Sequence, residues 1–136
     1  MKNNLKIFIL IVIIQIIMSY NKMKNCNDLL GILIYIFHHI FSVYLYYGWF
    51  IFKYNKLHLI LSIGVLLSWF LFKKCILTSL TNYLCDFEKS SKFDDILYYL
   101  KLTQHNELIH YIIIGSIIFY NVLRIVLKKK LLNISY

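Results

Sequence analysis

The 136-residue sequence has no proline, no alanine, only four glycines, and six acidic residues against fifteen basic ones. Without Pro/Gly-rich stretches or internal repeats there is no linker at which to divide the chain, so we expect one domain over residues 1–136. Glycine-rich phosphate loops, triad motifs and metalloprotease motifs are missing as well. No complete set of catalytic residues is visible, and we favour a role other than catalysis.

Apolar residues are what the chain has in excess, at 60% of the sequence. Such a chain has too little polar surface to cover a soluble domain, which predicts an integral membrane protein. A helix needs about 20 residues to cross about 30 Å of hydrocarbon. The second and fourth apolar stretches are long enough, and the shorter first and third need flanking lysine or aromatic anchors. The four stretches are residues 5–20, 29–52, 57–72 and 107–127.

The predicted fold is all-α, a small polytopic membrane bundle of four hydrophobic helices plus a short amphipathic helix. The bundle has three such helices if residues 1–20 are a cleaved signal, but no Ala-x-Ala site follows Ser19 and Tyr20, which favours a retained helix. The amphipathic helix is expected within the extramembrane segment 73–106. Its cap candidates are Ser90 and Ser91. Apolar residues then recur at helical spacing, and they are Phe93, Ile96, Leu97 and Leu100.

The net charge of +9 comes from lysines that flank apolar runs singly or in pairs, so we expect no nucleic-acid partner. The signal-like start and the basic residues 128–130 favour cytosolic amino and carboxyl termini, whereas Lys73 and Lys74 favour the opposite orientation. The bias toward Lys, Asn, Ile and Tyr suggests an AT-rich genome, such as that of a large DNA virus or a reduced parasite. Part of the lysine content therefore carries no functional meaning.

Each of the last three apolar stretches has a more polar stripe along one helix face, and such stripes face a bundle rather than lipid. These groups either hydrogen-bond helix to helix or form a functional site, and both interpretations stay open. Gly64 and Ser68 add a small-xxx-small pair. The stripes consist of Tyr35, His39, Ser42, Tyr46 and Trp49 with His38 at the edge; of His58, Ser62, Val65 and Trp69; and of His110, Ile114, Ile117, Asn121 and Arg124.

Depth along the helices separates the histidines. In an antiparallel hairpin that turns at residues 53–56, His39 lies level with Trp69 near the membrane middle, and His58 lies about 18 Å from His39. One haem iron cannot bind both of these imidazoles. His110 lies about 10 Å nearer the outer surface than His39, which disfavours a bis-His haem as well. We expect no bound cofactor.

The three cysteines, Cys26, Cys75 and Cys85, fall on the same side of the membrane in this topology. On an oxidising side they permit a disulfide among them, with one thiol left over and the pairing open. Their spacing matches no zinc motif, so we expect no metal site.

The order His39, Gly48, Leu57-His58, Trp69 and Cys75-Ile76-Leu77-Thr78 resembles an uncharacterised family of small polytopic membrane proteins, a domain of unknown function. That family has the signature His…His…Trp…Cys-Pro-Leu-Thr-x-x-Glu. The resemblance covers residues 39–84, with Ile76 in place of the Pro and Thr81 in place of the Glu. It implies a fold and a set of positions, without an established activity. Independently of it, Thr78 is expected to cap a short helix that runs through Leu84.

Two functions follow from these observations. The first is a non-enzymatic structural or interaction role for a multi-pass membrane protein, with the lipid bilayer and either a membrane-protein partner or a second copy as partners. The alternative is a membrane-embedded enzyme or redox component. Its candidate residues are His39, His58, Trp69, Cys75 and Thr78.

Overall fold

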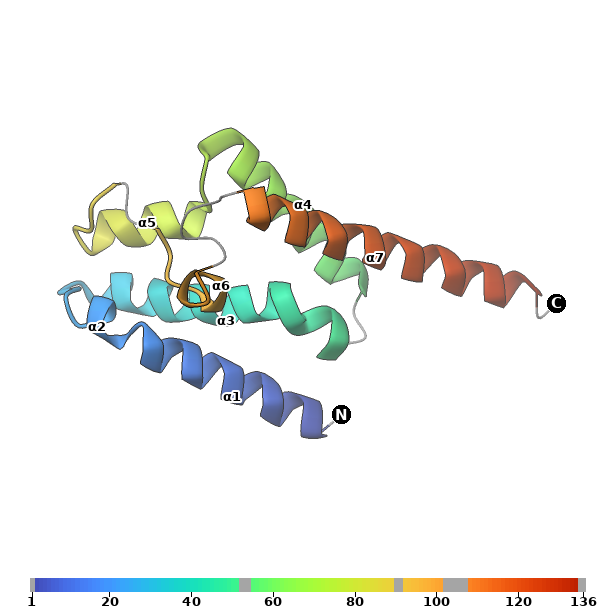
Figure 1. The fold of residues 1–136 in the computed structure, drawn as a ribbon, viewed down its shortest axis with the longest axis horizontal. Helices are drawn as coiled ribbons and strands as arrows, with labels where there is room; N and C mark the ends of the chain where they lie inside the picture. Colours follow the sequence, from blue (N-terminus) through green and yellow to red (C-terminus); the bar gives the residue numbers. More distant parts are fainter. Residues whose placement is uncertain (1, 52–54, 90–91, 102–107, 135–136) are drawn as a thin grey trace.

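The computed structural model describes residues 2–51, 55–89, 92–101 and 108–134, and over these residues the regular structure is entirely helical (Figure 1). The predicted all-α class is confirmed. The helices are α1 (Lys2–Met18), α2 (Tyr20–Met23), α3 (Leu29–Ile51), α4 (Asn55–Phe72), α5 (Ile76–Leu84), α6 (Ile96–Tyr99) and α7 (Leu108–Ile134).

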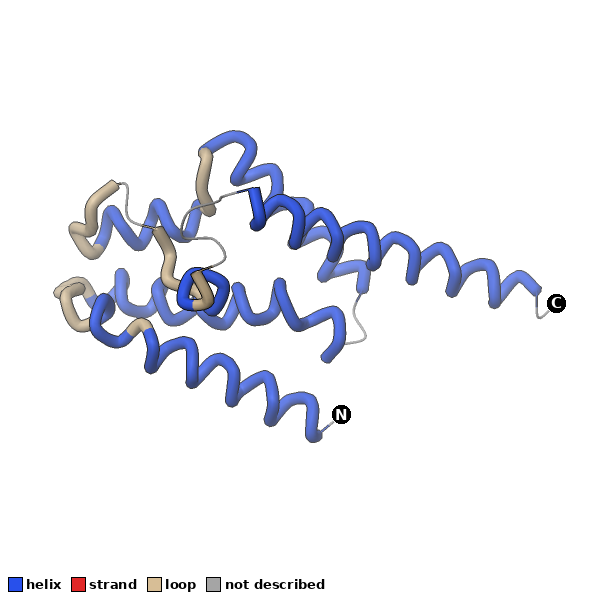
Figure 2. The backbone as a smooth tube through the Cα atoms, viewed as in Figure 1, coloured by secondary structure: helices blue, strands red, loops and turns tan. Residues whose placement is uncertain are grey.

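Helix α3 is the central element. It packs against α1 on one side and α5 on the other, while α4 packs against α3 and, most extensively, α7 (Figure 2). The start of α1, the end of α3, the start of α4 and the end of α7 lie toward one end of the bundle. The α2 turn and the end of α5 lie toward the other (Figure 1).

Among the described residues, two helices are long and apolar enough to cross a membrane, over Leu29–Trp49 in α3 and Leu108–Leu127 in α7. A third crossing is possible only if α4 and α5 act together, since they form a pair bent by 64° at their junction. The length and composition of the described helices thus support two or three of the four expected spans. The first apolar helix, Asn4–Met18, is shorter than these, and α5 of the bent pair lies within the predicted extramembrane segment 73–106.

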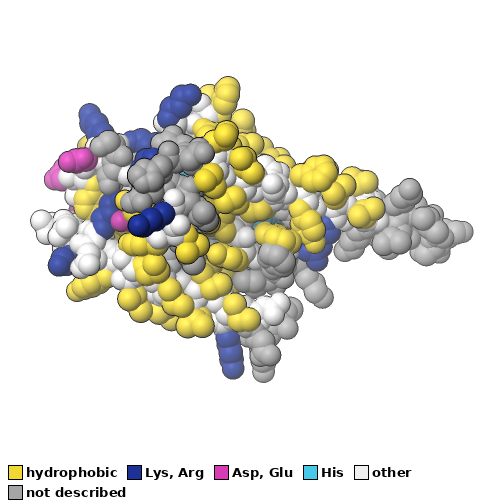
Figure 3. All heavy atoms as spheres, in the orientation of Figure 1, with side chains coloured by type: hydrophobic (Ala, Val, Ile, Leu, Met, Phe, Trp, Pro, Cys, Tyr) yellow, Lys and Arg dark blue, Asp and Glu magenta, His cyan; other side chains and the backbone are white. Residues whose placement is uncertain are grey.

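The bundle is polar inside and apolar outside. On α5 the buried side chains are Thr78, Thr81 and Asn82, whereas Ile76, Leu80 and Tyr83 are exposed. Large apolar side chains are also exposed along α1, α4 and α7, and they cover much of the face shown in Figure 3. A soluble bundle has the opposite arrangement, because water solvates polar groups and excludes apolar ones. The predicted polar stripes do face inward: Tyr35, His39, Ser42, His58, Ser62, Ile114, Ile117 and Asn121 are all buried.

A disulfide joins Cys26 to Cys85 and ties the start of α3 to the end of α5. Cys75 is free. Helix α3 begins beside this bond, where the Asp28 carboxylate accepts the amide N–H of Gly31 at 2.6 Å and so caps the helix. A Cβ atom on Gly31 would lie 2.6 Å from the sulfur of Cys85 and 3.0 Å from that of Cys26. Glycine at position 31 thus allows α3 to approach the disulfide.

The junction between α4 and α5 is held by Ser68. Its hydroxyl donates to the carbonyl of Lys74 at 3.2 Å and accepts the amide of Ile76 at 3.1 Å. Lys73 adopts a left-handed conformation with φ of 60°, which ends α4 without a glycine. The short helix through Leu84 was predicted correctly, but the Thr78 cap was wrong: the helix starts at Ile76 after Cys75, and Thr78 lies inside its first turn.

The amphipathic helix expected around residues 93–100 is a single turn, α6. Phe93 precedes it, and its ring packs against the histidines of α3. Asp95 provides the N-terminal cap by accepting the amide of Tyr98 at 2.8 Å. The proposed caps Ser90 and Ser91 lie outside the described residues. Lys101, with φ of 59°, ends the turn.

Candidate functional site

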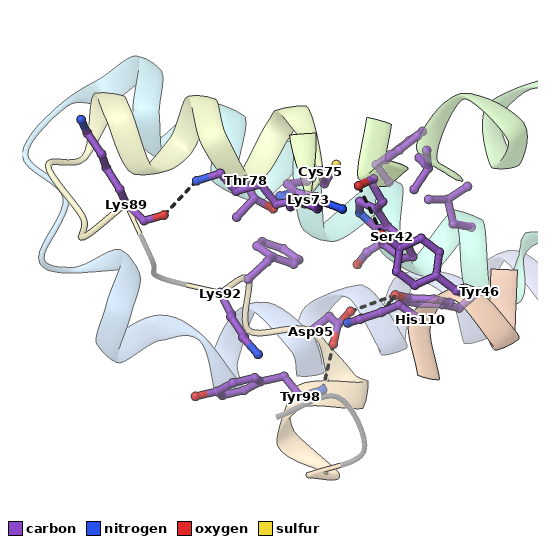
Figure 4. Close-up of a pocket in the computed structure, with 18 residues that line it drawn as sticks. Ser42, Tyr46, Lys73, Cys75, Thr78, Lys89, Lys92, Asp95, Tyr98 and His110 are labelled. Carbon is purple, nitrogen blue, oxygen red and sulfur yellow. Dashed lines mark hydrogen bonds between the residues drawn. The ribbon is translucent and has the colours of Figure 1, made fainter. Parts of the chain in front are cut away.

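A cavity of about 470 Å³ lies where α3, the α4–α5 junction, the segment 92–98 and the start of α7 meet (Figure 4). Its size falls in the range of small-molecule sites. The apolar and aromatic part of the wall includes Phe41, Leu45, Val65, Trp69, Phe93 and Tyr111. The polar part includes His38, Ser42, Tyr46, Cys75, Thr78, Asp95, Tyr98 and His110, and four lysines complete the lining.

Three polar side chains from different parts of the chain form a hydrogen-bonded row on this wall. The Tyr46 hydroxyl donates to Asp95 Oδ2 at 3.0 Å and lies 3.1 Å from His110 Nδ1. Since the hydroxyl has a single proton and Asp95 receives it, His110 donates from Nδ1 to the Tyr46 oxygen. The indole of Trp69 packs edge-on against His110 at 4.8 Å between ring centroids. The row joins α3, α6 and α7.

Asp95 is the acidic group of the cavity wall, and it is almost completely buried. Burial raises the pKa of its carboxyl, while the hydrogen bond from the Tyr98 amide, the charge of His110 and the Tyr46 hydroxyl oppose that rise. Burial likewise raises the pKa of the neighbouring Asp94, opposed by the ammonium of Lys22 at 3.3 Å. The carboxylate of Asp95 thus accepts hydrogen bonds from two groups of the protein, the Tyr46 hydroxyl and the Tyr98 amide.

Four lysines, Lys73, Lys74, Lys89 and Lys92, line the cavity. The ammonium of Lys74 donates to the carbonyl of Lys89 at 2.8 Å. In Figure 4 the ammonium of Lys89 points away from the cavity and that of Lys92 points toward Tyr98. Four cations against one carboxylate give this part of the wall a positive potential.

His38 and His39 lie side by side against one aromatic ring. The imidazole of His38 stacks on Phe93 with 3.6 Å between centroids, and that of His39 lies 4.5 Å from the same ring. Both histidines are buried. Among the described residues, Nδ1 of His38 and both ring nitrogens of His39 have no hydrogen-bond partner. Only His38 lines the cavity.

The five predicted site residues separate into two groups. Trp69, Cys75 and Thr78 lie on the cavity wall, whereas His39 and His58 do not line it. His58 instead joins three helices. Its Nε2 lies 3.1 Å from the carbonyl of Tyr44 and 3.0 Å from that of Leu45, and its Nδ1 lies 3.0 Å from Nδ2 of Asn121. Because carbonyls only accept, Nε2 bears the proton and Nδ1 accepts from Asn121.

Asp95, Phe93 and the lysines at the mouth of the cavity were not among the predicted site residues. Asp95 and Phe93 lie on the surface helix that we expected between the spans, so no membrane argument drew attention to them. In the sequence, Lys73 and Lys74 bear on the orientation of the chain in the membrane. Their position directly after an apolar stretch, next to Cys75, is the sequence signal that could have indicated a place on the cavity wall.

Within the described residues, no group of three or more His, Cys, Asp or Glu side chains is arranged to hold a metal ion. Comparison of the chain with protein-family models, curated proteins and solved structures gives no match. The geometry of the chain itself is therefore the basis for the functional argument.

Proposed function

We propose that this chain is a non-enzymatic, multi-pass integral membrane protein with an interaction role, and that its amino and carboxyl ends are cytosolic. The observation that carries the proposal is the inverted distribution of side chains, polar within the bundle and apolar on its surface. In hydrocarbon an outward apolar face costs nothing, whereas polar groups require partners inside the protein.

The use of the buried polar groups supports a non-enzymatic role. His58 is fully engaged by Tyr44, Leu45 and Asn121, and Tyr46 bridges Asp95 and His110. Gln15 on α1 donates to Ser42 on α3 at 2.9 Å. These bonds hold the helices together, and they occupy these groups within the protein.

The disulfide supports the orientation. Cys26 and Cys85 lie at the end of the bundle opposite the start of α1 and the end of α7. Structural disulfides form in oxidising compartments, so this end belongs on the non-cytosolic side and the two chain ends on the cytosolic side. The cytosolic side then includes Lys56 and Arg124.

Two single-cysteine reporters test the placement in intact cells. In a Cys75→Ser background the disulfide stays closed, and Lys24→Cys and Lys56→Cys each add one exposed thiol near opposite ends of the bundle. A membrane-impermeant maleimide should label the cysteine at position 24 directly and the cysteine at position 56 only after permeabilisation. Labelling of position 56 in intact cells would reverse the orientation, and labelling of both positions would contradict a membrane-spanning bundle.

A membrane enzyme or redox component is the second candidate, because one cavity wall brings together Cys75, Thr78 and Trp69. Cys75 is a free thiol beside a row of hydrogen-bonded side chains. This candidate predicts that Cys75→Ser abolishes a cellular phenotype of the gene while the folded protein accumulates normally. An unchanged phenotype excludes thiol chemistry at this position.

A further inference from the structure

We propose that the cavity binds the phosphate-bearing headgroup and the single acyl chain of an anionic lipid. The proposal rests on the membrane placement argued above and adds the chemical class of the ligand. It depends on three kinds of side chain that line the cavity: lysines, apolar and aromatic residues, and polar groups.

The lysines account for the anionic headgroup. Lys73, Lys74, Lys89 and Lys92 come from the α4–α5 junction and the segment after α5, and all four line the cavity. The ammonium of Lys74 donates to the carbonyl of Lys89 and that of Lys89 points away from the cavity (Figure 4), so Lys73 and Lys92 are the pair that we assign to the headgroup. In the proposed orientation all four lie on the non-cytosolic side, where the positive-inside rule disfavours basic residues. A phosphate held between ammonium groups compensates such an arrangement through charge-assisted hydrogen bonds.

The deeper wall accounts for the acyl chain. Phe41, Leu45, Val65 and Trp69 come from α3 and α4, the helices that face hydrocarbon on their outer sides. At about 30 Å³ per water-sized group, a cavity of 470 Å³ holds on the order of fifteen such groups. That volume fits a headgroup with part of one chain, and we therefore propose one acyl chain rather than two.

His38 indicates that the cavity is built for a ligand with polar atoms as well. It lines the cavity, only 4% of its surface is exposed, and its Nδ1 has no hydrogen-bond partner among the described residues. A buried polar atom without a partner is costly. A hydroxyl or ester group between phosphate and chain supplies the missing partner.

The fluorescence of Trp69 reports occupancy. The chain has two tryptophans, so Trp49→Phe leaves Trp69 as the sole reporter on the cavity wall. Titration of this variant in detergent with lysophosphatidic acid should shift the emission and saturate. Lysophosphatidylcholine of the same chain length, which has no net charge, should bind about tenfold more weakly, because it lacks one charge-assisted contact. Inorganic phosphate alone should give no response.

Two matched pairs of variants assign the parts of the site. Lys73→Gln with Lys92→Gln should weaken lysophosphatidic acid binding about tenfold. The control is Lys24→Gln with Lys101→Gln, which removes two exposed lysines outside the cavity. The backbone of Lys101 is left-handed, as is that of Lys73. Val65→Phe fills the cavity and should weaken both lysolipids, whereas Leu67→Phe, on the outer face of α4, should not.

The proposal is overturned by equal binding of the two lysolipids, by saturable binding of inorganic phosphate in place of lipid, or by equal losses in the cavity and control variants. If Trp49→Phe does not fold, native mass spectrometry of the unmodified chain measures the same three ligands directly, and absence of bound lysophosphatidic acid there is a negative result. None of these outcomes alters the labelling pattern of positions 24 and 56, so the ligand and the membrane placement are tested separately.

Discussion

Asn121 of α7 donates a hydrogen bond from Nδ2 to Nδ1 of His58 on α4, over 3.0 Å, and both side chains are fully buried. Asn121 also donates to the carbonyl of Ile117 on its own helix. The histidine in turn reaches two carbonyls of α3. One imidazole thus links the three longest apolar helices. In a hydrocarbon environment, the polar groups that it joins would have no other hydrogen-bond partner.

Replacement of either partner leaves the other unsatisfied. We expect His58→Leu and Asn121→Leu each to lower the free energy of unfolding by about 1–3 kcal/mol. The double variant should lose less than the sum, with a coupling energy of about 1 kcal/mol, as in other membrane bundles. Thermal unfolding of the four proteins in detergent measures the cycle. Ser116→Ala is the control, since Ser116 is exposed on α7 and bonds only within its own helix. Additive losses would show that the pair does not interact.

Gly31 predicts a sharp contrast among the glycines. In Gly31→Ala the new methyl would press on the sulfur atoms of the disulfide, and we expect a loss of about 1–3 kcal/mol. In Gly64→Ala and Gly115→Ala the methyl meets nothing within 4 Å, and the higher helix propensity of alanine should stabilise the protein by up to about 1 kcal/mol. Unfolding midpoints of the three variants provide the comparison, and a stable Gly31→Ala protein would contradict the close approach.

The apolar pattern predicted where the long helices lie and which faces they bury. The stretch 29–52 corresponds to α3 and the stretch 57–72 to α4, and the stripe with His58 and Ser62 is buried as expected. Periodicity of 3.6 residues is a local property, so it can be read from one segment. The span count was less accurate, because a bend such as that between α4 and α5 depends on a serine bonding across the junction.

The partners of the buried groups were not predictable in the same way. His58 and Asn121 are 63 residues apart, and Tyr46 and Asp95 are 49 apart. These pairs depend on how α7 and the segment between α5 and α7 pack against α3 and α4, and the sequence signal in that segment indicates a surface helix. Depth arithmetic predicts Trp69 level with His39, but it does not give the ring contact of Trp69 with His110, which lies on another helix.

Reduction of the disulfide should destabilise the bundle. Cys26 and Cys85 are separated by 59 residues, and closing a loop of that length restricts the unfolded chain by about 4 kcal/mol on a chain-entropy estimate. We expect a lower unfolding midpoint in reducing agent and the same midpoint for Cys26→Ser with and without it. Cys75→Ser is the control, because it removes the free thiol and leaves the bond intact. Equal midpoints for all proteins under oxidising conditions would argue against the bond.

Asp95 predicts a pH dependence with a definite sign. Burial raises the pKa of its carboxyl in the folded protein above the ordinary value of 3.8. At pH values between 3.8 and the raised pKa, the folded state binds a proton that the unfolded state does not. The contribution of Asp95 to the free energy of unfolding is therefore full at low pH and is lost as the pH rises. Asp95→Asn has no such titration and keeps an oxygen to accept the Tyr98 amide.

The quantity to measure is therefore the difference between the unfolding free energies of the natural protein and Asp95→Asn at a series of pH values. Taking the difference cancels the titration of groups that both proteins share. We expect the difference to shift in favour of Asp95→Asn as the pH rises from about 4 toward 7. Asp86→Asn, at an exposed carboxyl in the turn after α5, is the matched control variant. A shift of the opposite sign for Asp95→Asn would mean that its hydrogen bonds with Tyr46 and Tyr98 outweigh its burial.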